Sequence, residues 1–308
     1  MGGYFNHLWN NSLWRSDMLK KIISPILIAN QLNKRIYFSG NGYGPFDQSE
    51  EFFYYIFNYL KNVKYGVRDR LYSDKYLKKI GIEDKKIKFI PDDLLILNQD
   101  ILKYSIKHPK IETGGKYIIL ELYYPLEEME EYKVTIKNFC KYIFENYNLK
   151  VIFVPFDFER GGMWQRELLK QEIPELLDYD LSIPGFLPIQ DLVDLIKNAE
   201  LVICNRYHAL VFSLALGTPV INIMKKVCDD YRYYFNKNYG VLEYVFSGLE
   251  FNELDFLNLD LKEALNKVQN ELKNIIEKQK QLYDSSRYSL NMKELEKVRK
   301  EYLKEVLS

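Results

Sequence analysis

Short apolar runs alternate along this chain with longer segments whose apolar residues recur at helical spacing, and this alternation decides the class of fold. Strands are expected over residues 34–40, 64–69, 86–92, 116–122, 149–156, 200–204 and 219–223. Helices are expected over 49–63, 73–81, 127–147, 188–199 and 206–216. Strands that alternate with helices form parallel β-α-β units. The strand segments are almost continuously apolar, which is typical of strands covered on both faces.

The alternation breaks at residues 105–115, where a proline, polar residues and two adjacent glycines occur together. Such a stretch indicates a domain boundary. We therefore expect an N-terminal α/β domain over 1–110, a C-terminal α/β domain over 111–250 and amphipathic Lys/Glu-rich helices over 251–308. The fold class is two doubly wound parallel-sheet domains that face across a cleft. Ligands of such sheets lie beyond the carboxyl ends of the strands.

Composition restricts the partners and the compartment. The 43 basic and 43 acidic residues balance, which argues against general binding to nucleic acid. No segment is apolar for long enough to span a membrane, and residues 1–20 lack the pattern of a signal peptide. The cysteines are odd in number and lack zinc-type spacing (Cys140, Cys204 and Cys228). Reduced thiols in a cytoplasmic protein are the simplest interpretation.

The segment "LVICNRYHALVFSLALGTPVINI" (201–223) predicts a strand, a helix and a second strand. Asn205 is the expected N-cap, and Gly217 is expected to end the helix. Arg206 and His208 then lie in the first turn, where free backbone N–H groups and the helix dipole favour an anion. An arginine fork suits a carboxylate or phosphate, and a histidine exchanges protons near neutral pH.

The alternative for this segment is structural. Arg206 pairs with a nearby acid in that interpretation, and His208 is an interior histidine whose hydrogen bonds are satisfied. The position between two buried strands favours the anion site.

The N-terminal half carries a second candidate site. "FSGNGYGPF" (38–46) places Gly40, Gly42 and Gly44 directly after a strand, where glycines permit positive φ and close approach of a ligand. The spacing matches neither a dinucleotide fingerprint nor a P-loop, so a tight turn is an equal interpretation. Arg68 follows the next strand and would face the same cleft. Its alternative role is a local pair with Asp69.

Other polar segments are less specific. Asp157, in "VPFDFERGG" (154–162), is a possible site residue at a strand end, although a solvated loop is an alternative. For Asp92 and Asp93 we prefer helix capping, and we expect no metal ion because two adjacent carboxylates do not make a metal site. Residues 225–240 either close over the cleft or form a packed surface segment. The remaining histidines, His7 and His108, are interpreted as surface or packing residues.

Taken together, these segments resemble the polysaccharide pyruvyl transferase family. The resemblance rests on an early Gly-Gly before an amphipathic helix, "GNGYGPF", "VRDRLYSDKYLKKIGI", "IPDD" and "RYHALVFSLALGTPVI", and spans most of residues 2–240. The Arg-x-His helix and the Gly-x-Gly-Pro loop are its most specific parts. Family members usually begin with a further strand, glycine-rich turn and helix, so the resemblance implies an N-terminal domain without its first β-α unit.

The resemblance implies a glycosyltransferase-B-like fold and transfer of a pyruvyl group from phosphoenolpyruvate to a sugar, usually as a cyclic ketal. The expected acceptor is a sugar or lipid-linked glycan of a cell-surface polysaccharide, and no cofactor is expected. Arg206 and His208 are the expected catalytic residues. The residues expected to bind substrate are Arg68, Gly42, Gly44, Asn205, Tyr207 and Asp157.

Two other functions fit the same sequence. A nucleotide-sugar glycosyltransferase would use the Arg-x-His helix for a diphosphate. A truncated, non-catalytic relative would bind a glycan or a protein partner without turnover.

Overall fold

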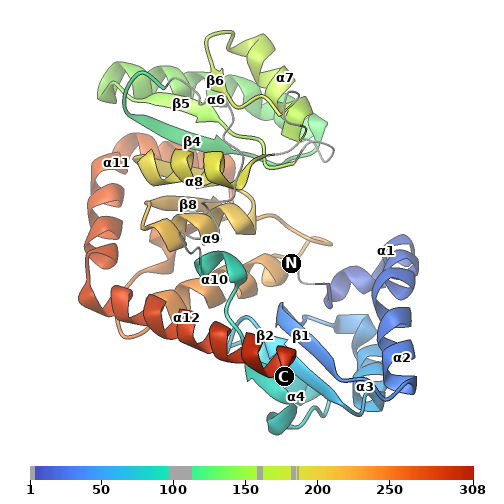
Figure 1. Cartoon of the computed structure of the whole chain (residues 1–308). Helices are drawn as coiled ribbons and strands as arrows, with labels where there is room; N and C mark the ends of the chain where they lie inside the picture. Colours follow the sequence, from blue (N-terminus) through green and yellow to red (C-terminus); the bar gives the residue numbers. More distant parts are fainter. Residues whose placement is uncertain (1–3, 97–112, 158–161, 182–184, 186) are drawn as a thin grey trace. The chain divides into compact units, whose positions relative to one another are not determined.

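The chain forms two compact units (Figure 1). This computed structural model describes residues 4–96, 113–157, 162–181, 185 and 187–308. Unit 1 consists of three segments, Met1–Asp93, Lys225–Ser247 and Leu290–Ser308. Unit 2 consists of two segments, Leu94–Met224 and Gly248–Ser289. Each unit is built on a parallel sheet with helices, which confirms the expected class of two parallel-sheet α/β domains.

The division into units differs from the predicted domains after residue 224, where Gly248–Ser289 belongs to unit 2 and the segments on either side of it belong to unit 1. Residues 225–247 and 290–308 belong to unit 1, although the sequence placed them with the C-terminal domain and with separate helices. The reason is packing within unit 1. Tyr302 is buried and donates a hydrogen bond to the Phe38 carbonyl oxygen at 2.7 Å. Amphipathic spacing predicts a helix but does not say which sheet it covers. The predicted boundary after residue 110 lies outside the described residues.

Unit 1 has a three-stranded parallel sheet in the order β1-β2-β3. Its strands are β1 (Ile36–Asn41), β2 (Val63–Val67) and β3 (Ile87–Phe89). Its helices are α1 (Ser12–Met18), α2 (Ser24–Gln31), α3 (Glu50–Tyr59), α4 (Ser73–Lys79), α10 (Arg232–Val245) and the part of α12 (Ser286–Leu307) from Leu290 onward. Short 3₁₀ turns at His7–Asn10 and Asp47–Ser49 precede α1 and α3.

Aromatic rings dominate the core of unit 1. Phe5, Phe38, Phe53 and Phe57 are buried, and the Phe5 ring lies edge-to-face against the other three at centroid distances of 5.2–5.9 Å. Such edge-to-face pairs add about 0.5–1.5 kcal/mol each beyond the burial of their area. The N-terminal segment is therefore anchored to β1 and α3.

Unit 2 has a six-stranded parallel sheet in the order β6-β5-β4-β7-β8-β9. Its strands are β4 (Tyr117–Glu121), β5 (Lys150–Phe153), β6 (Leu177–Asp178), β7 (Leu201–Cys204), β8 (Val220–Ile223) and β9 (Leu257–Asn258). Its helices are α6 (Leu126–Tyr147), α7 (Gly162–Glu172), α8 (Ile189–Asn198), α9 (Tyr207–Leu216) and α11 (Leu261–Tyr283). The two-residue edge strands β6 and β9 were not predicted, because two residues carry no periodic signal.

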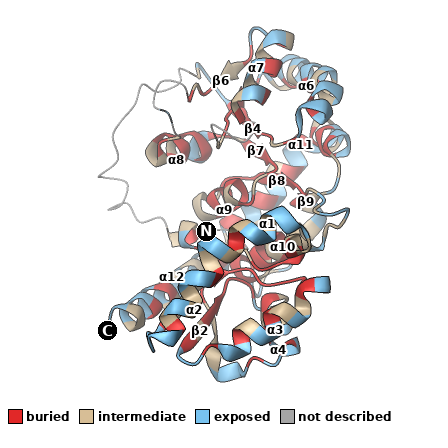
Figure 2. Ribbon diagram, turned by 90° about the vertical axis from the view of Figure 1, so that its right-hand side faces the viewer, coloured by how far each residue is buried: buried red, intermediate tan, exposed pale blue. Residues whose placement is uncertain are grey.

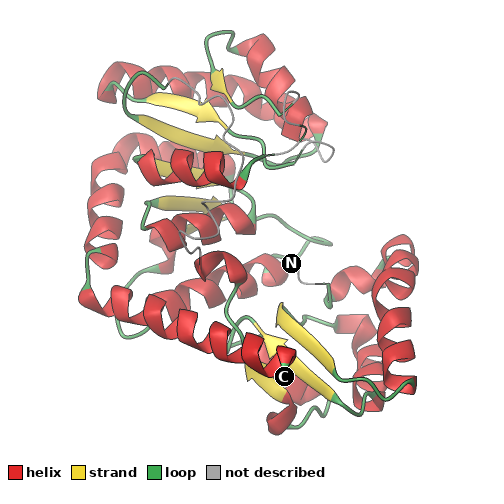
Figure 3. Cartoon of the chain, viewed as in Figure 1, coloured by secondary structure: helices red, strands yellow, loops and turns green. Residues whose placement is uncertain are grey.

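Helices cover both faces of the unit 2 sheet (Figure 3). Apolar residues of α6, α7 and α11 join one face of β4, β5, β7 and β8 in a single hydrophobic cluster. Helix α9 packs on β7 and β8 and contacts α8. The Tyr117 hydroxyl of β4 donates to the Leu195 carbonyl oxygen of α8 at 2.8 Å. The central strands are buried along their length (Figure 2), as their continuous apolar sequence predicted.

Candidate functional site

The sheet of unit 2 has a topological switch point between β4 and β7. From β4 the chain continues outward to β5 and β6, and from β7 it continues in the opposite direction to β8 and β9. The two strands pair in parallel, and Glu121 lies opposite Cys204 at their carboxyl ends. Ligands of open parallel sheets bind beyond the carboxyl ends at such a point. The Arg-x-His segment begins there.

The N-cap residue of helix α9 does not cap the helix with its own side chain. Arg206 occupies the N-cap position with extended backbone (φ −79°, ψ 136°), and its side chain makes no capping hydrogen bond. The first N–H groups of a helix have no partner within the helix, and they carry its positive dipole. At the other end Gly217 adopts left-handed backbone (φ 68°), as predicted.

The prediction that Asn205 caps this helix is wrong. Its side chain is buried and makes three hydrogen bonds away from the helix: Oδ1 accepts from the Tyr123 N–H at 3.0 Å, and Nδ2 donates to the Tyr124 hydroxyl and the Ile223 carbonyl oxygen. A buried amide requires such partners. Asn205 therefore joins the ends of neighbouring strands, and the helix begins one residue later than expected.

Glu121 is the main residue of this site that the sequence did not single out. Its carboxylate is fully buried at the end of β4 and accepts hydrogen bonds from the N–H groups of Asn205 and Arg206 at 3.1 and 2.9 Å. It also accepts from Arg206 Nε at 3.1 Å. Burial raises the pKa of Glu121, while the charge and hydrogen bonds of Arg206 act in the opposite direction. In the sequence, the position of Glu121 near the end of the apolar strand "KYIILEL" (116–122) could have indicated a functional residue.

The guanidinium of Arg206 is held on several sides. Its Nη1 lies 3.6 Å from Asp157 Oδ2, and its central carbon lies 4.3 Å from the centre of the Tyr123 ring. Nη2 is buried and has no hydrogen-bond partner among the described residues. The pairing of Arg206 with a nearby acid, which the sequence left as an alternative, is therefore present. The predicted site residue Asp157 lies beside the same group.

His208 and Tyr207 occupy the first turn of α9, as predicted. His208 is partly exposed, whereas Tyr207 is buried. Their rings contact each other edge-to-face at a centroid distance of 5.7 Å. Most of the rest of α9 is apolar and buried, so these two side chains and Arg206 form the polar start of the helix. Unit 2 thus brings together five of the predicted residues, which are Asp157, Asn205, Arg206, Tyr207 and His208.

Unit 1 brings Gly42 and Arg68 together. Arg68 is 1% exposed, and a Cβ atom on Gly42 would lie 2.9 Å from its Nη2. Gly44 has positive φ (73°), and a Cβ there would lie 2.3 Å from the Tyr76 ring. Both glycines are therefore required by close packing against side chains of this chain. That finding supports the tight-turn interpretation of the loop and leaves its role toward a ligand a prediction.

The proposed local pair of Arg68 with Asp69 is only part of the environment of that acid. Asp69 is buried, and its Oδ1 accepts from the N–H groups of Tyr72 and Ser73 at 2.7 and 2.9 Å. Its Oδ2 accepts from the Ser73 hydroxyl. Burial raises the pKa of Asp69, and these bonds together with the charge of Arg68 lower it. Asp69 therefore fixes the start of α4.

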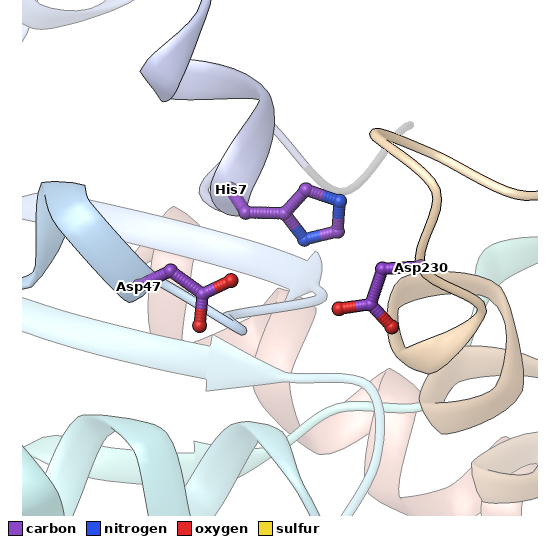
Figure 4. A group of neighbouring side chains, drawn as sticks. All are labelled: His7, Asp47 and Asp230. Atoms are coloured by element: carbon purple, nitrogen blue, oxygen red, sulfur yellow. The ribbon is translucent and has the colours of Figure 1, made fainter.

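Three further polar residues of unit 1 lie together, and the sequence did not connect them. They are His7, Asp47 and Asp230 (Figure 4). His7 is 2% exposed, which excludes a surface role. Of the other predicted polar residues, Asp93 forms an ion pair with Arg299 at 2.5 Å, and His108 lies outside the described residues.

The family model for polysaccharide pyruvyl transferase matches residues 2–224 of this chain. The chain belongs to the polysaccharide pyruvyl transferase family. The match includes the switch point of unit 2 and the glycine loop of unit 1. No curated protein matches this pyruvyl transferase family member by sequence.

Solved structures place the family member among glycosyltransferase-B-like folds. The UDP-GlcNAc 2-epimerase from Neisseria meningitidis is 11% identical and has a TM-score of 0.59; the match covers 92% of this chain and 73% of that one. The UDP-GlcNAc 2-epimerase of Methanocaldococcus jannaschii is 17% identical with a TM-score of 0.52, over 83% and 70% of the two chains. These identities support the fold alone. Within the described residues, no helix is both long and apolar enough to cross a membrane.

Proposed function

We propose that this family member transfers the pyruvyl group of phosphoenolpyruvate to a sugar or lipid-linked glycan of a cell-surface polysaccharide and forms a ketal. The observation that carries the proposal is the start of α9, with Arg206 and His208, at the switch point of a sheet in a pyruvyl transferase family member. Free thiols at Cys140, Cys204 and Cys228 support a cytoplasmic location.

The donor presents two anionic groups on a small carbon frame. In the proposed complex, the first N–H groups of α9 and the remaining Nη2 donor of Arg206 bind these groups. Glu121 and Asp157 hold the guanidinium in one orientation, so little side-chain entropy is lost when the donor binds. The two acids also offset part of the charge of Arg206, so tight anion binding needs both the guanidinium and the helix start.

The reaction needs a proton at the methylene carbon of the donor and removal of a proton from each attacking hydroxyl. Protonation makes the adjacent carbon electrophilic; one sugar hydroxyl then adds, and a second displaces phosphate. His208 is the proposed acid–base group because it is partly exposed in the first turn of α9. Arg206 stabilises negative charge on the leaving phosphate. Arg68, Gly42 and Gly44 remain proposed contacts for the acceptor.

Thermal melting with phosphoenolpyruvate tests donor binding. A ligand at a hundred times its Kd stabilises a protein by about 2.7 kcal/mol. We expect phosphoenolpyruvate to raise the melting temperature of the unaltered chain and of Arg166→Lys, and to have a much smaller effect on Arg206→Lys. Arg166 is a matched control because it also pairs with carboxylates of unit 2, which are Glu167, Asp178 and Asp180.

Release of inorganic phosphate in the presence of an acceptor glycan tests the reaction. His208→Asn should lower the rate of phosphate release by about 10²–10⁴-fold while the rise in melting temperature with phosphoenolpyruvate persists. Stabilisation by UDP and not by phosphoenolpyruvate would favour the nucleotide-sugar alternative. Stabilisation by neither ligand in a folded chain would favour the non-catalytic one.

A further inference from the structure

Three segments of unit 1 that are distant in the sequence place one potential metal ligand each at a common point. His7 begins the 3₁₀ turn His7–Asn10, Asp47 begins the turn Asp47–Ser49, and Asp230 ends a tight turn closed by hydrogen bonds with Val227. We call His7, Asp47 and Asp230 the His7 cluster. One ligand atom of each residue lies within 4.8 Å of the other two. Figure 4 shows the imidazole above the two carboxylates.

The ring of His7 is oriented as in a metal ligand. Its Nε2 lies 2.9 Å from the Val227 carbonyl oxygen, which only accepts hydrogen bonds, so Nε2 carries a proton. Nδ1 is buried and has no hydrogen-bond partner among the described residues. In Figure 4 this nitrogen is on the side of both carboxylates. Metal-binding histidines almost always donate their other ring N–H to a carbonyl, a carboxylate or water, which fixes the tautomer.

Both carboxylates are reachable from solvent. The side chains of Asp47 and Asp230 are 36% and 23% exposed. Arg232 bonds to both acids, with Nη2 2.9 Å from Asp47 Oδ2 and Nε 2.6 Å from Asp230 Oδ2. Its side chain is 53% exposed, so it can leave toward solvent.

We propose that the His7 cluster is a binding site for a divalent transition metal, with Zn²⁺ as the expected ion. One imidazole and two carboxylates form a three-ligand set that Zn²⁺ accepts, with water in the fourth position. Two carboxylates neutralise the ion once Arg232 turns away. The sequence-based expectation of no metal ion concerned the adjacent pair Asp92 and Asp93. The three residues of the His7 cluster are too far apart in the sequence to form a recognisable metal-binding motif.

The distances require only a small closure. Ligand atoms at about 2.1 Å from a tetrahedral zinc ion are about 3.4 Å apart. The atoms of the cluster lie within 4.8 Å of one another, and both acids are on short turns at the surface of unit 1. Binding would tie the N-terminal segment, the loop after β1 and the segment before α10 to one another. Free zinc should therefore stabilise unit 1.

The test is a competition titration of the chelator-treated full chain with Zn²⁺ against a chromophoric chelator at neutral pH. We expect one equivalent of zinc per chain and a rise in melting temperature. Asp47→Asn should weaken zinc binding at least tenfold, and it is compatible with the positive φ of 45° at this position, because asparagine tolerates that region. His7→Gln should weaken binding at least as much.

Three variants separate this proposal from nonspecific attraction. Asp229→Asn removes one negative charge from the turn that also contains Asp230, but Asp229 is exposed and lies outside the His7 cluster. Like Asp47, Asp229 has positive φ (58°), so asparagine fits equally well there. This variant should leave zinc binding unchanged within twofold. Arg232→Gln removes the competing cation and should strengthen zinc binding severalfold. Cys228→Ser should have no effect, which excludes the exposed thiol of the same turn as the ligand.

Several outcomes would overturn the proposal. They are zinc binding that survives both Asp47→Asn and His7→Gln, zinc binding lost in Cys228→Ser, weaker binding in Arg232→Gln, and no stoichiometric binding in the folded unaltered chain. Tighter binding of Mg²⁺ than of Zn²⁺ would contradict the role of the imidazole, because Mg²⁺ prefers oxygen ligands. None of these measurements involves phosphoenolpyruvate, so their outcome neither supports nor contradicts the proposed pyruvyl transfer.

Discussion

At the residue scale, the pair of Glu121 and Arg206 decides how the start of α9 is presented. A buried carboxylate that accepts three hydrogen bonds from two consecutive residues holds both the backbone and the guanidinium in place. Such a pair is costly to separate, because removing one partner leaves the other charge without compensation in a poorly solvated place. The positions of Arg206 and of the helix end therefore depend on an acid from another strand.

Removing the buried charge of Glu121 by itself favours folding, but the amide leaves the charge of Arg206 without its partner and cannot accept all three hydrogen bonds. Because breaking a buried pair costs more than this relief, Glu121→Gln should lower the free energy of unfolding by about 3 kcal/mol. A loss of that size lowers the melting temperature of a unit of 150–250 residues by about 6–12 °C. Thermal melting at neutral pH measures it.

The control is Glu200→Gln. Glu200 pairs with Lys116 and Lys280, whose side chains are 75% and 51% exposed. Exposed pairs contribute at most about 1 kcal/mol, so this variant should melt close to the unaltered chain. Equal losses in the two variants would show that Glu121 contributes no more than a surface acid.

Glu243 in α10 gives a prediction on pH. Burial raises its pKa, Arg70 opposes this shift, and its Oε2 has no hydrogen-bond partner among the described residues. A raised pKa in the folded state means that the contribution of Glu243 to stability is fully present below its unfolded value of about 4.3 and is lost as pH rises through the folded value.

Glu243→Gln should therefore melt about 1–2 °C above the unaltered chain at neutral pH, and this difference should disappear below about pH 4. Melting curves from pH 4 to 8 measure the difference. A variant that is less stable at pH 7 and equal to the unaltered chain at pH 4 would reverse the sign and contradict the assigned shift.

At the element scale, strands and helices were predictable where the apolar pattern was long and regular. Segments 116–122 and 127–147 correspond to β4 (Tyr117–Glu121) and α6 (Leu126–Tyr147) within one residue or two at each end. Gly217 marked the end of α9, because left-handed backbone favours glycine. The start of α9 was less predictable. Asparagine is a common N-cap residue, but the side chain of Asn205 forms its hydrogen bonds with Tyr123, Tyr124 and Ile223.

Contacts between distant elements were the part that the sequence did not reveal. Glu121 and Arg206 are joined by the pairing of β4 with β7, and His7 meets Asp47 and Asp230 through three separate turns. Neither arrangement has a local pattern. The residues of the Arg-x-His segment were identifiable because a strand, a polar tripeptide and an apolar helix are consecutive in the chain.

At the scale of the whole molecule, unit 1 depends on the segment Leu290–Ser308. Tyr302 is buried against β1, Arg299 Nη1 donates to the Ser39 hydroxyl at 2.6 Å, and Asn291 Nδ2 donates to the carbonyl oxygens of Val245 and Ser247. Losing a buried aromatic side chain alone typically costs about 3–5 kcal/mol.

A chain that ends at Ser289 should therefore lose the ordered sheet of unit 1 and keep that of unit 2. Hydrogen exchange followed by mass spectrometry checks this. Peptides from β1 and β2 should exchange at least tenfold faster than in the full chain, while peptides from β4 and β7 should be unchanged. A chain that ends at Glu305 keeps Tyr302 and serves as the control. Uniform protection in both truncated chains would contradict the assignment of α12 to unit 1.

The interleaving of the two units sets an order of events during synthesis. Unit 2 has all its residues once Ser289 has left the ribosome, whereas unit 1, which begins the chain, still lacks the segment up to Ser308. Its first segment ends roughly 215 residues earlier, a wait of about 10–40 s at usual elongation rates. During that time the segment Leu290–Ser308, which contains Tyr302, is not yet available to pack against β1 beside Phe38. The nascent N-terminal half is thus the part of this protein that we expect a ribosome-associated chaperone to hold.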